Sequence, residues 1–315
     1  MSASHAGVST VPTGPRPSLA GREVVVGFDG GEPARAAVRW AAREAARLGS
    51  PLTIVYAANV PAVSAWSPGT AVVLDGLGDV SERVAAEGAA IARESAPDVR
   101  VRSQGTIGGA AGELIGRSGE AGLVVVGRRR RSALASAALG SVSFAVILHA
   151  RCPVVVVQEG TEEAAAASGG AVVVGVDGSR AAQAALELAA ELAAAWGAPL
   201  SVVAAWSVPA SEPWSEALGP EAAQAAYHDA RRGAEEVVVA ALDRVRSAHP
   251  GTEVSVNVVQ GPADEVLAEA SRSAGLVVVG SRGHGGFAGM MLGSIGHSVL
   301  RKAFSPVAVV RWGSW

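Results

Sequence analysis

The chain has 315 residues, enough for two domains of ordinary size. Hydrophobic residues make up 49% of it and charged residues 17%, a composition typical of an α/β protein with buried sheets and not of a disordered or fibrous chain. The formal net charge of -3 provides no overall positive field, so the sequence predicts neither a nucleic-acid partner nor a membrane partner.

The amino-terminal segment 1–20 is rich in Ser, Pro, Gly and Ala and lacks the basic start and apolar core of a signal peptide, so we expect a disordered tail. No apolar stretch reaches the roughly 18 residues of a membrane span. Cys152 is the single cysteine and no Cys/His group has metal-ligand spacing, so we expect a reduced, buried thiol and no metal held by protein side chains. These features predict a soluble, cytoplasmic protein.

Strands and helices are predicted to alternate after the tail. Short runs of β-branched residues predict buried strands, and amphipathic segments predict helices. The first run starts at residue 23 and ends in an acidic turn at Asp29; the later predicted strands are 52–57, 99–104, 123–127 and 154–157, and the predicted helices are 33–48, 81–96, 112–118 and 142–149. This alternation predicts a parallel sheet with helices on both faces.

The same pattern restarts at Ala171, after a segment 159–170 that is acidic, then alanine-rich, and ends Ser-Gly-Gly. We interpret that segment as a linker between a first domain, 21–158, and a second domain, 171–315. In the second domain the predicted strands begin with 172–176 and continue with 200–205, 253–259, 276–280 and 307–311, and the predicted helices are 180–195, 221–248, 261–273 and 294–304.

The two halves correspond closely, with a net five extra residues in the second half between its first and fourth strands. Asp29 and Asp177 are 148 positions apart, whereas Gly127 and Gly280, like Gly140 and Gly293, are 153 apart. The glycine-containing loop therefore has the same length in both halves, which indicates a tandem duplication.

The loop after the fourth strand of the second half has the spacing G-x2-G-x9-G-S, formed by Gly280, Gly283, Gly293 and Ser294. Glycines let backbone N–H groups approach an anion closely, and Ser294 lies where a helix begins and its dipole favours negative charge. The spacing differs from the Walker and dinucleotide motifs. We interpret the loop as a phosphate cradle; a purely structural glycine loop is the alternative.

Ligands of open α/β sheets bind outside the carboxyl ends of the strands, where the strand order reverses. If the first and fourth strands are neighbours, Asp177 and the Gly280 loop share that crevice. The Asp177 carboxylate would then accept hydrogen bonds from ribose hydroxyls, with an apolar wall at the end of the second strand holding the base. The competing role for Asp177 is that of a turn former that binds its own backbone.

The V-G-x-D strand end, the G-x2-G-x9-G-S loop and the final valine strand after Cys-Pro or Ser-Pro resemble the universal stress protein family over nearly all of both halves, in the tandem arrangement of actinobacterial members. The resemblance implies two tandem Rossmann-like domains of the adenine nucleotide alpha hydrolase-like type. Each would have a five-stranded parallel sheet in the order 3-2-1-4-5. It also implies ATP as the ligand, with ADP or AMP left open and Mg²⁺ carried by the nucleotide.

By the same resemblance, Ala205 offers its backbone to adenine, Asp177 meets the ribose and the glycine loop surrounds the phosphates. The residues implied for the second half are Asp177, Gly178, Ser179, Ala205, Gly280, Arg282, Gly283, Gly293, Ser294 and Ile295.

The first half departs from the motif. Arg130 takes the place of the second glycine, within the run 128–131, and Gly31 matches Ser179. The arginine run is either an adapted anion site or a solvated patch on a decayed loop. If the lost glycine had positive φ, Arg130 would strain the loop by about 1–2 kcal/mol. We therefore predict a weaker first site, with the candidate residues Asp29, Ala57, Gly127, Arg130, Gly140, Ser141 and Val142.

Four other residues near the motif have less specific roles. His284 and His297 flank the glycine loop, but no Ser/His/Asp or metal arrangement surrounds them, so we favour surface positions for both. Trp206 and Trp214 follow the second strand and could cover a base, although packing is the more frequent use of Trp.

Three functions are compatible with these features. The first is an ATP-dependent regulator or sensor that acts on an unknown protein partner. In the family, single domains pair through their last strands, which implies an intramolecular pseudo-dimer through 154–157 and 307–310 and leaves a further homodimer open. The alternatives are a weak ATP hydrolase or other adenine-nucleotide-processing enzyme, which the loop disfavours because it has no Walker lysine, and an interaction module that binds no nucleotide.

Overall fold

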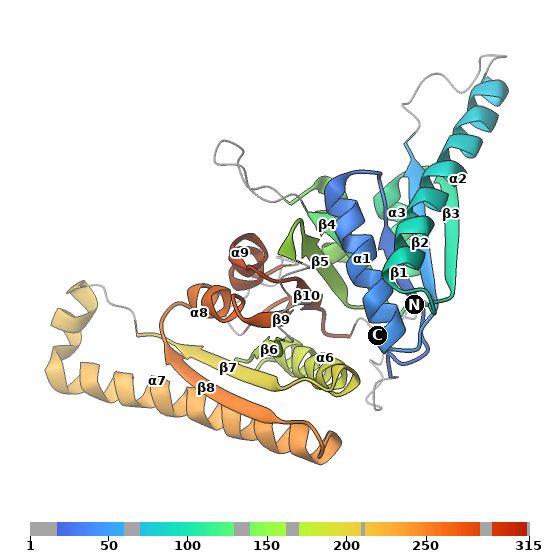
Figure 1. Ribbon diagram of the computed structural model, residues 1–315. Coiled ribbons are helices and arrows are strands. Elements are labelled where there is room, and N and C mark those ends of the chain that lie inside the picture. The colour runs from blue at the N-terminus through green and yellow to red at the C-terminus, as the bar shows by residue number, and fades with distance from the viewer. Residues whose placement is uncertain are drawn as a thin grey trace, which may run out of the picture.

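The computed structural model describes residues 18–59, 70–128, 139–161, 170–208, 212–283 and 292–313, with the backbone alone described at 70–75, 212–218 and 220. Strands and helices alternate through both halves (Figure 1). The strands are β1 (Val24–Gly27), β2 (Leu52–Ala58), β3 (Val101–Ile107), β4 (Leu123–Arg128), β5 (Val154–Gln158), β6 (Ala171–Gly175), β7 (Leu200–Trp206), β8 (Val254–Gln260), β9 (Ala274–Gly280) and β10 (Val307–Val310). The helices are α1 (Glu32–Arg47), α2 (Thr70–Ser95), α3 (Ala110–Arg117), α4 (Ser141–His149), α6 (Arg180–Trp196), α7 (Glu212–Ala248), α8 (Ala263–Ala270) and α9 (Ser294–Lys302).

The strands form one continuous sheet in the order β3-β2-β1-β4-β5-β10-β9-β6-β7-β8. Within each half all pairings are parallel, and both halves have the order 3-2-1-4-5. The predicted fold class and strand order are therefore confirmed.

Alternating side chains of the strands divide the core between the two faces of the sheet. Val24 and Val26 pack in the cluster that contains α1, α2, α6 and α7, whereas Val25 packs in the cluster that contains α3, α4, α8 and α9. Because side chains of a strand alternate between faces, such doubly covered strands are apolar throughout, which is why they appear in the sequence as valine runs.

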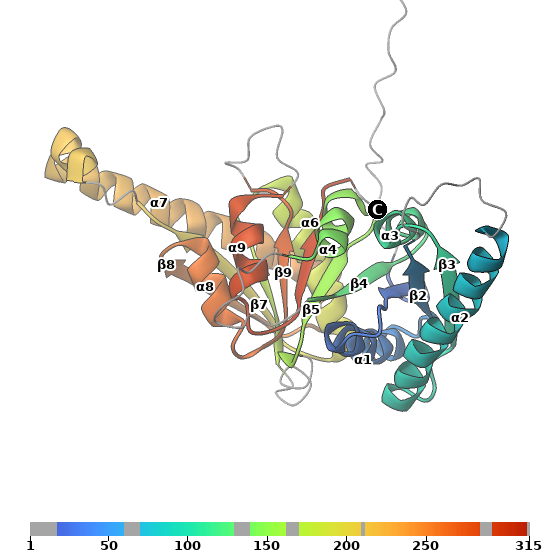
Figure 2. The ribbon, with the colours of Figure 1, turned by 90° about the horizontal axis from the view of Figure 1, so that it is seen from above.

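The halves meet where β10 pairs antiparallel with β5, with Val307 opposite Val156 and Val309 opposite Val154. The predicted pairing of residues 154–157 with 307–310 is therefore confirmed. Figure 2 shows the halves side by side, with α2 near one end of the molecule and α7 at the other.

Side chains at the ends of these two strands also bridge the halves. Gln158 Nε2 donates to the carbonyl oxygen of Ala303 at 3.0 Å, and Arg311 donates to that of Ala150 at 3.1 Å. Ala150 and Ala303 follow α4 and α9, so each half caps the last helix of the other.

A buried carboxyl group lies between α1 and α6. Glu44 has no exposed surface, and both of its oxygens accept from the indole N–H of Trp196, at 2.9 and 3.1 Å. Burial raises the pKa of Glu44 to about 7, against the opposing effects of Trp196 and of Arg47, whose guanidinium lies 3.7 Å away.

Two helices begin earlier than predicted. α2 starts at Thr70 instead of residue 81 and continues through Gly76 and Gly78, because each glycine weakens a helix by only about 1 kcal/mol. α7 starts at Glu212 instead of residue 221, but Gly219 within it has φ 74°, so a kink lies just before the predicted start.

Cys152 is buried, as predicted, and burial raises the pKa of its thiol to about 12. None of the helices in the described part of the chain is both long and apolar enough to span a bilayer.

Candidate functional site

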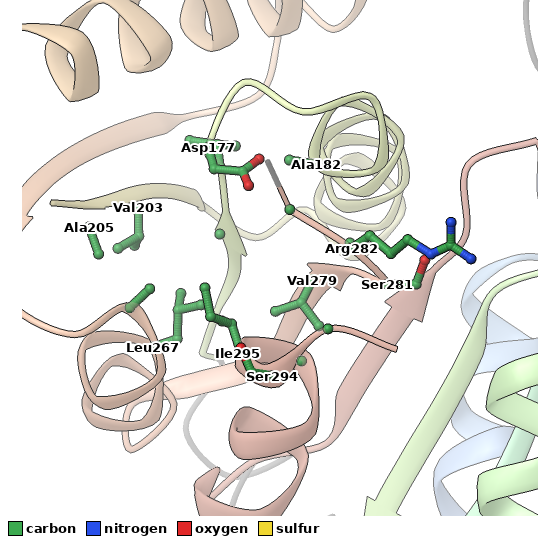
Figure 3. Close-up of a pocket in the computed structure, with 17 residues that line it drawn as sticks. Asp177, Ala182, Val203, Ala205, Leu267, Val279, Ser281, Arg282, Ser294 and Ile295 are labelled. Carbon is green, nitrogen blue, oxygen red and sulfur yellow. The ribbon is translucent and has the colours of Figure 1, made fainter. Parts of the chain in front are cut away.

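A cavity of about 320 Å³ opens at the carboxyl ends of the second half's strands. Parallel pairing of β6 with β9 brings Asp177, which follows β6, beside the loop that follows β9 (Figure 3). Of the residues predicted for this site, those that line the cavity are Asp177, Ala205, Gly280, Arg282, Gly283, Gly293, Ser294 and Ile295. The crevice thus lies where the sheet topology rule placed it.

Asp177 takes part in a turn and also faces the cavity. Its Oδ1 accepts from the backbone N–H of Ser179 at 2.9 Å, and Gly178 between them has φ 84°. The competing role as a turn former is therefore real for one carboxylate oxygen. The other, Oδ2, lies 2.4 Å from where a β-carbon on Gly283 would stand, so it points across the cavity toward the glycine loop.

Packing explains the absence of a side chain differently at each of the three motif glycines. A β-carbon on Gly280 would lie 2.7 Å from the carbonyl carbon of Ala181, so this glycine permits the first turn of α6 to pack against β9. At position 283 a β-carbon would collide with the carboxylate of Asp177. Gly283 does not have positive φ, so an arginine would be unfavourable there because of this collision and not because of backbone strain. A β-carbon on Gly293 would make only ordinary contacts, 3.5 Å from the Ser281 carbonyl oxygen. The protein's own packing therefore does not require glycine at 293.

The amino terminus of α9 forms one wall of the cavity. Gly293 is its N-cap residue, and no side chain caps the helix at this end. The first N–H groups of a helix lack partners within it, and the helix dipole adds positive potential there. Ser294 and Ile295, both exposed, begin the helix, so the hydroxyl of Ser294 and these N–H groups can meet an anion in the cavity.

The opposite wall is apolar. Val203 and Ala205 come from the end of β7, and Leu267 comes from α8 (Figure 3). A β-carbon on Gly175 would stand 2.8 Å from Leu267 Cδ1, so that glycine admits Leu267. Leu267 was not predicted from the sequence, although the repeat contains the same pair in the first half. There a β-carbon on Gly27 would stand 2.9 Å from Leu114 Cδ1.

Three further predicted residues, Gly178, Ser179 and Arg282, shape the turn and the loop beside the cavity. Ser179 caps α6 by accepting from the N–H of Ala182 at 3.2 Å, and its hydroxyl lies 3.4 Å from the carbonyl oxygen of Arg282. Gly178 and Ser179 do not line the cavity; they hold the turn below it. The guanidinium of Arg282 points away from Asp177 (Figure 3).

Two of the other candidate side chains, those of Trp206 and His297, do not line the cavity. Trp206 is buried and meets Tyr227 edge to face, with ring centroids 4.6 Å apart, so packing is its role. His284 and the side chain of Trp214 are outside the described residues.

The first half keeps the turn but differs around it. Asp29 Oδ1 accepts from the N–H of Gly31 at 2.9 Å. Gly140 is the N-cap residue of α4, and Ser141 and Val142 that follow it are exposed, like their counterparts in the second half; Ala57 is the last but one residue of β2. Arg130 lies outside the described residues.

Two side chains change the first half further. Ser143 stands where the second half has Gly296, and its hydroxyl donates to the Gly127 carbonyl oxygen at 3.2 Å. Arg128 is only 5% exposed and donates to the Leu300 carbonyl oxygen near the end of α9. For Arg128 the interpretation of the run as a solvated patch is therefore wrong, because this side chain is buried and joins the two halves.

The fold and this cavity define a class: a duplicated, doubly wound α/β protein with a ligand-sized cavity at the carboxyl edge of its sheet. The model of the universal stress protein family matches residues 21–158 and again 170–311. The chain belongs to the universal stress protein family.

Relatives and solved structures agree with this assignment. Two universal stress proteins of Mycobacterium tuberculosis are each 33% identical to the chain, over 296 and 293 residues, with 91% of this chain and 96% of theirs covered. A universal stress protein from Archaeoglobus fulgidus has the same fold, with a TM-score of 0.67 at 21% identity over 92% of this chain and 98% of its own.

Proposed function

We propose that the cavity of the second half binds an adenine nucleotide, ATP in the first place, with Mg²⁺ carried by the nucleotide. The observation that carries the proposal is the facing pair at the cavity: the uncapped α9 terminus, opened by a glycine that the protein's own packing does not need, lies opposite the Asp177 carboxylate. One end of the cavity thus favours phosphate, and the other provides an acceptor for ribose hydroxyls.

Each wall then has a chemical task. The N–H groups at the start of α9 and the Ser294 hydroxyl bind phosphate oxygens. Asp177 Oδ2 accepts from the ribose, while Oδ1 remains in the turn. The base packs on the apolar surface formed by Val203, Ala205 and Leu267. The backbone of Ala205 forms hydrogen bonds with the edge of the base. The nucleotide supplies the negative charge that this helix terminus lacks.

The first half is the weaker site in this proposal. Ser143 places a side chain at the position of Gly296, which lines the cavity in the second half, and Arg128 is bonded to the end of α9 at the junction. Asp29, Gly140 and Ser141 retain positions that could hold a nucleotide with lower affinity.

We infer that occupancy regulates what the protein contacts, with residues 21–158 and 171–315 as the two functional units. The nucleotide would bind at the start of α9, and the end of that helix is bonded to the first half through Arg128 and Gln158. Because α9 has only nine residues, a displacement of its start on nucleotide binding would also displace its end and change these bonds. The contact regulated in this way would be with a protein partner.

The test is calorimetric titration of ATP-Mg²⁺ into the parent chain and two matched variants, Gly293→Val and Gly140→Val. These positions are repeat equivalents, and a β-carbon makes no close contact at either. Both variants should fold, as circular dichroism can check. The proposal predicts that Gly293→Val loses at least tenfold in affinity and that Gly140→Val retains the parent's tight site. Equal affinity in all three proteins would refute it.

A further inference from the structure

Four residues at the carboxyl edge of the second half's sheet, Arg180, Arg282, Arg311 and Trp312, form a group that we call the arginine–tryptophan rim. Arg282 lines the cavity itself, and Arg311 and Trp312 follow directly on β10. Arg180 is the first residue of α6. All four therefore lie at the same carboxyl edge of the sheet as the cavity.

Two contacts connect the elements that carry the rim. The Ser179 hydroxyl lies 3.4 Å from the Arg282 carbonyl oxygen, which holds the start of α6 against the loop after β9. The guanidinium carbon of Arg180 lies 5.5 Å from the centroid of the Trp312 ring. These contacts link the loop that lines the cavity to Trp312 through the start of α6.

The rim concentrates positive charge. Burial, and next the neighbouring Arg282, lower the pKa of Arg311, so the two guanidinium groups repel one another. Arg311 is held by its bond to the Ala150 carbonyl oxygen. Within the described part of the chain, no carboxylate lies within ion-pair distance of Arg180 or Arg282. An anion with several charges would relieve this repulsion.

The rim also presents an aromatic surface. Trp312 is 47% exposed, so part of its ring is accessible to a ligand. Indole rings stack well on nucleobases, and a neighbouring guanidinium adds a cation–π contribution.

The size of the cavity limits what it can hold. A volume of about 320 Å³ is at the lower end for small-molecule sites, so it suits a nucleoside and its first phosphates. A longer phosphate chain would leave the cavity past Arg282 and meet the rim.

We propose that the rim is a second subsite, and that the full ligand is a dinucleoside polyphosphate. One adenosine occupies the cavity, the phosphate chain lies along Arg282 and Arg180, and the second base stacks on Trp312. This inference rests on the proposed function, because the first adenosine uses the same cavity.

The experiment compares three probes by calorimetry on the full chain: AMP, ATP and diadenosine tetraphosphate. The variants are Trp312→Ala and, as a matched control, Phe304→Ala, since Phe304 is also an exposed ring (40%) beneath an arginine, Arg272, at 3.8 Å. Because stacking of one base contributes about a factor of ten or more, diadenosine tetraphosphate should bind the parent at least tenfold more tightly than ATP.

The rim predicts that Trp312→Ala removes that advantage and leaves ATP binding unchanged, while Phe304→Ala changes neither. Arg282→Ala should weaken binding in the order diadenosine tetraphosphate, ATP, AMP, and Arg272→Ala should have no effect. If ATP and diadenosine tetraphosphate bind equally to the parent, the second subsite is refuted although the nucleotide cavity stands. If no probe binds, the proposed function itself fails and the rim proposal fails with it.

Discussion

The carboxylate of Asp177 leaves no room for a side chain on Gly283: its Oδ2 lies 2.4 Å from the position that a β-carbon would take. The two residues are more than 100 positions apart in sequence and meet because β6 pairs with β9. The Asp177 carboxylate therefore explains why residue 283 is a glycine. The same proximity places the carboxylate at the cavity.

This contact predicts the effect of the smallest substitution. Gly283→Ala should push the Asp177 side chain away from the loop and weaken ATP binding at least tenfold, with little change in stability because the loop is exposed. Gly251→Ala is the control, since Gly251 is exposed and has nothing within 4 Å of a β-carbon. Unchanged affinity in Gly283→Ala would show that the position of the carboxylate does not matter.

The two functions of Asp177 can be separated by two substitutions. Asp177→Asn keeps an oxygen that can accept from the Ser179 N–H, so the turn should survive while the charged ribose acceptor is lost. Asp177→Ala loses the turn as well and should cost about 1 kcal/mol more in the free energy of unfolding. Urea denaturation measures the turn and calorimetry the ribose contact. Asp29→Asn in the first half should leave the tight site unaffected.

Glu44 predicts a pH dependence of stability that a glutamine would abolish. Burial raises its pKa from 4.5 to about 7, so between these values the unfolded chain ionises at this group while the folded chain stays protonated. The contribution of Glu44 to stability is therefore fully present below pH 4.5 and is lost as the pH rises to about 7. The loss is at most about 3 kcal/mol.

The measurement is the difference in unfolding free energy between the parent and Glu44→Gln, by urea denaturation at pH 5 and pH 8. Glutamine keeps an oxygen for the Trp196 indole without the charge. The variant should gain stability relative to the parent as the pH rises. A difference that does not vary with pH would mean that Glu44 is not protonated in the folded protein near pH 6.

The junction makes a further prediction about Gln158. Its side chain is buried and donates to the carbonyl oxygens of Leu300 and Ala303 at the end of α9. Gln158→Leu leaves the Ala303 oxygen without this donor and should cost about 1–3 kcal/mol. Gln224→Leu, on the exposed surface of α7, should cost less than about 0.5 kcal/mol. Equal unfolding free energies for the two variants would argue against a structural role for this bond.

The sequence predicted those features that depend on local pattern and on repetition. Valine runs mark strands covered on both faces, equal spacing of Gly127/Gly140 and Gly280/Gly293 marks the duplication, and the parallel topology places the cavity. Each of these follows from a rule that needs no knowledge of which side chains touch.

Features that depend on contacts between distant residues could not be predicted. Gly280 appears in the sequence as part of an anion motif, yet its lack of a side chain serves the packing of α6. Arg128 appears in a basic run, yet it is buried at the end of a helix of the other half. The pairing of Glu44 with Trp196 has no local signal at all, because neither residue lies in a motif.

The measurement that tests the central claim most directly is the nucleotide content of the chain purified without added ligand. The protein is denatured, and any released nucleotide is identified and counted by chromatography and mass spectrometry, alongside Gly283→Arg, which copies the residue at position 130 into the second half. We predict about one adenine nucleotide per parent chain and much less in the variant. No nucleotide in the parent, together with no calorimetric binding of ATP-Mg²⁺, would contradict the account.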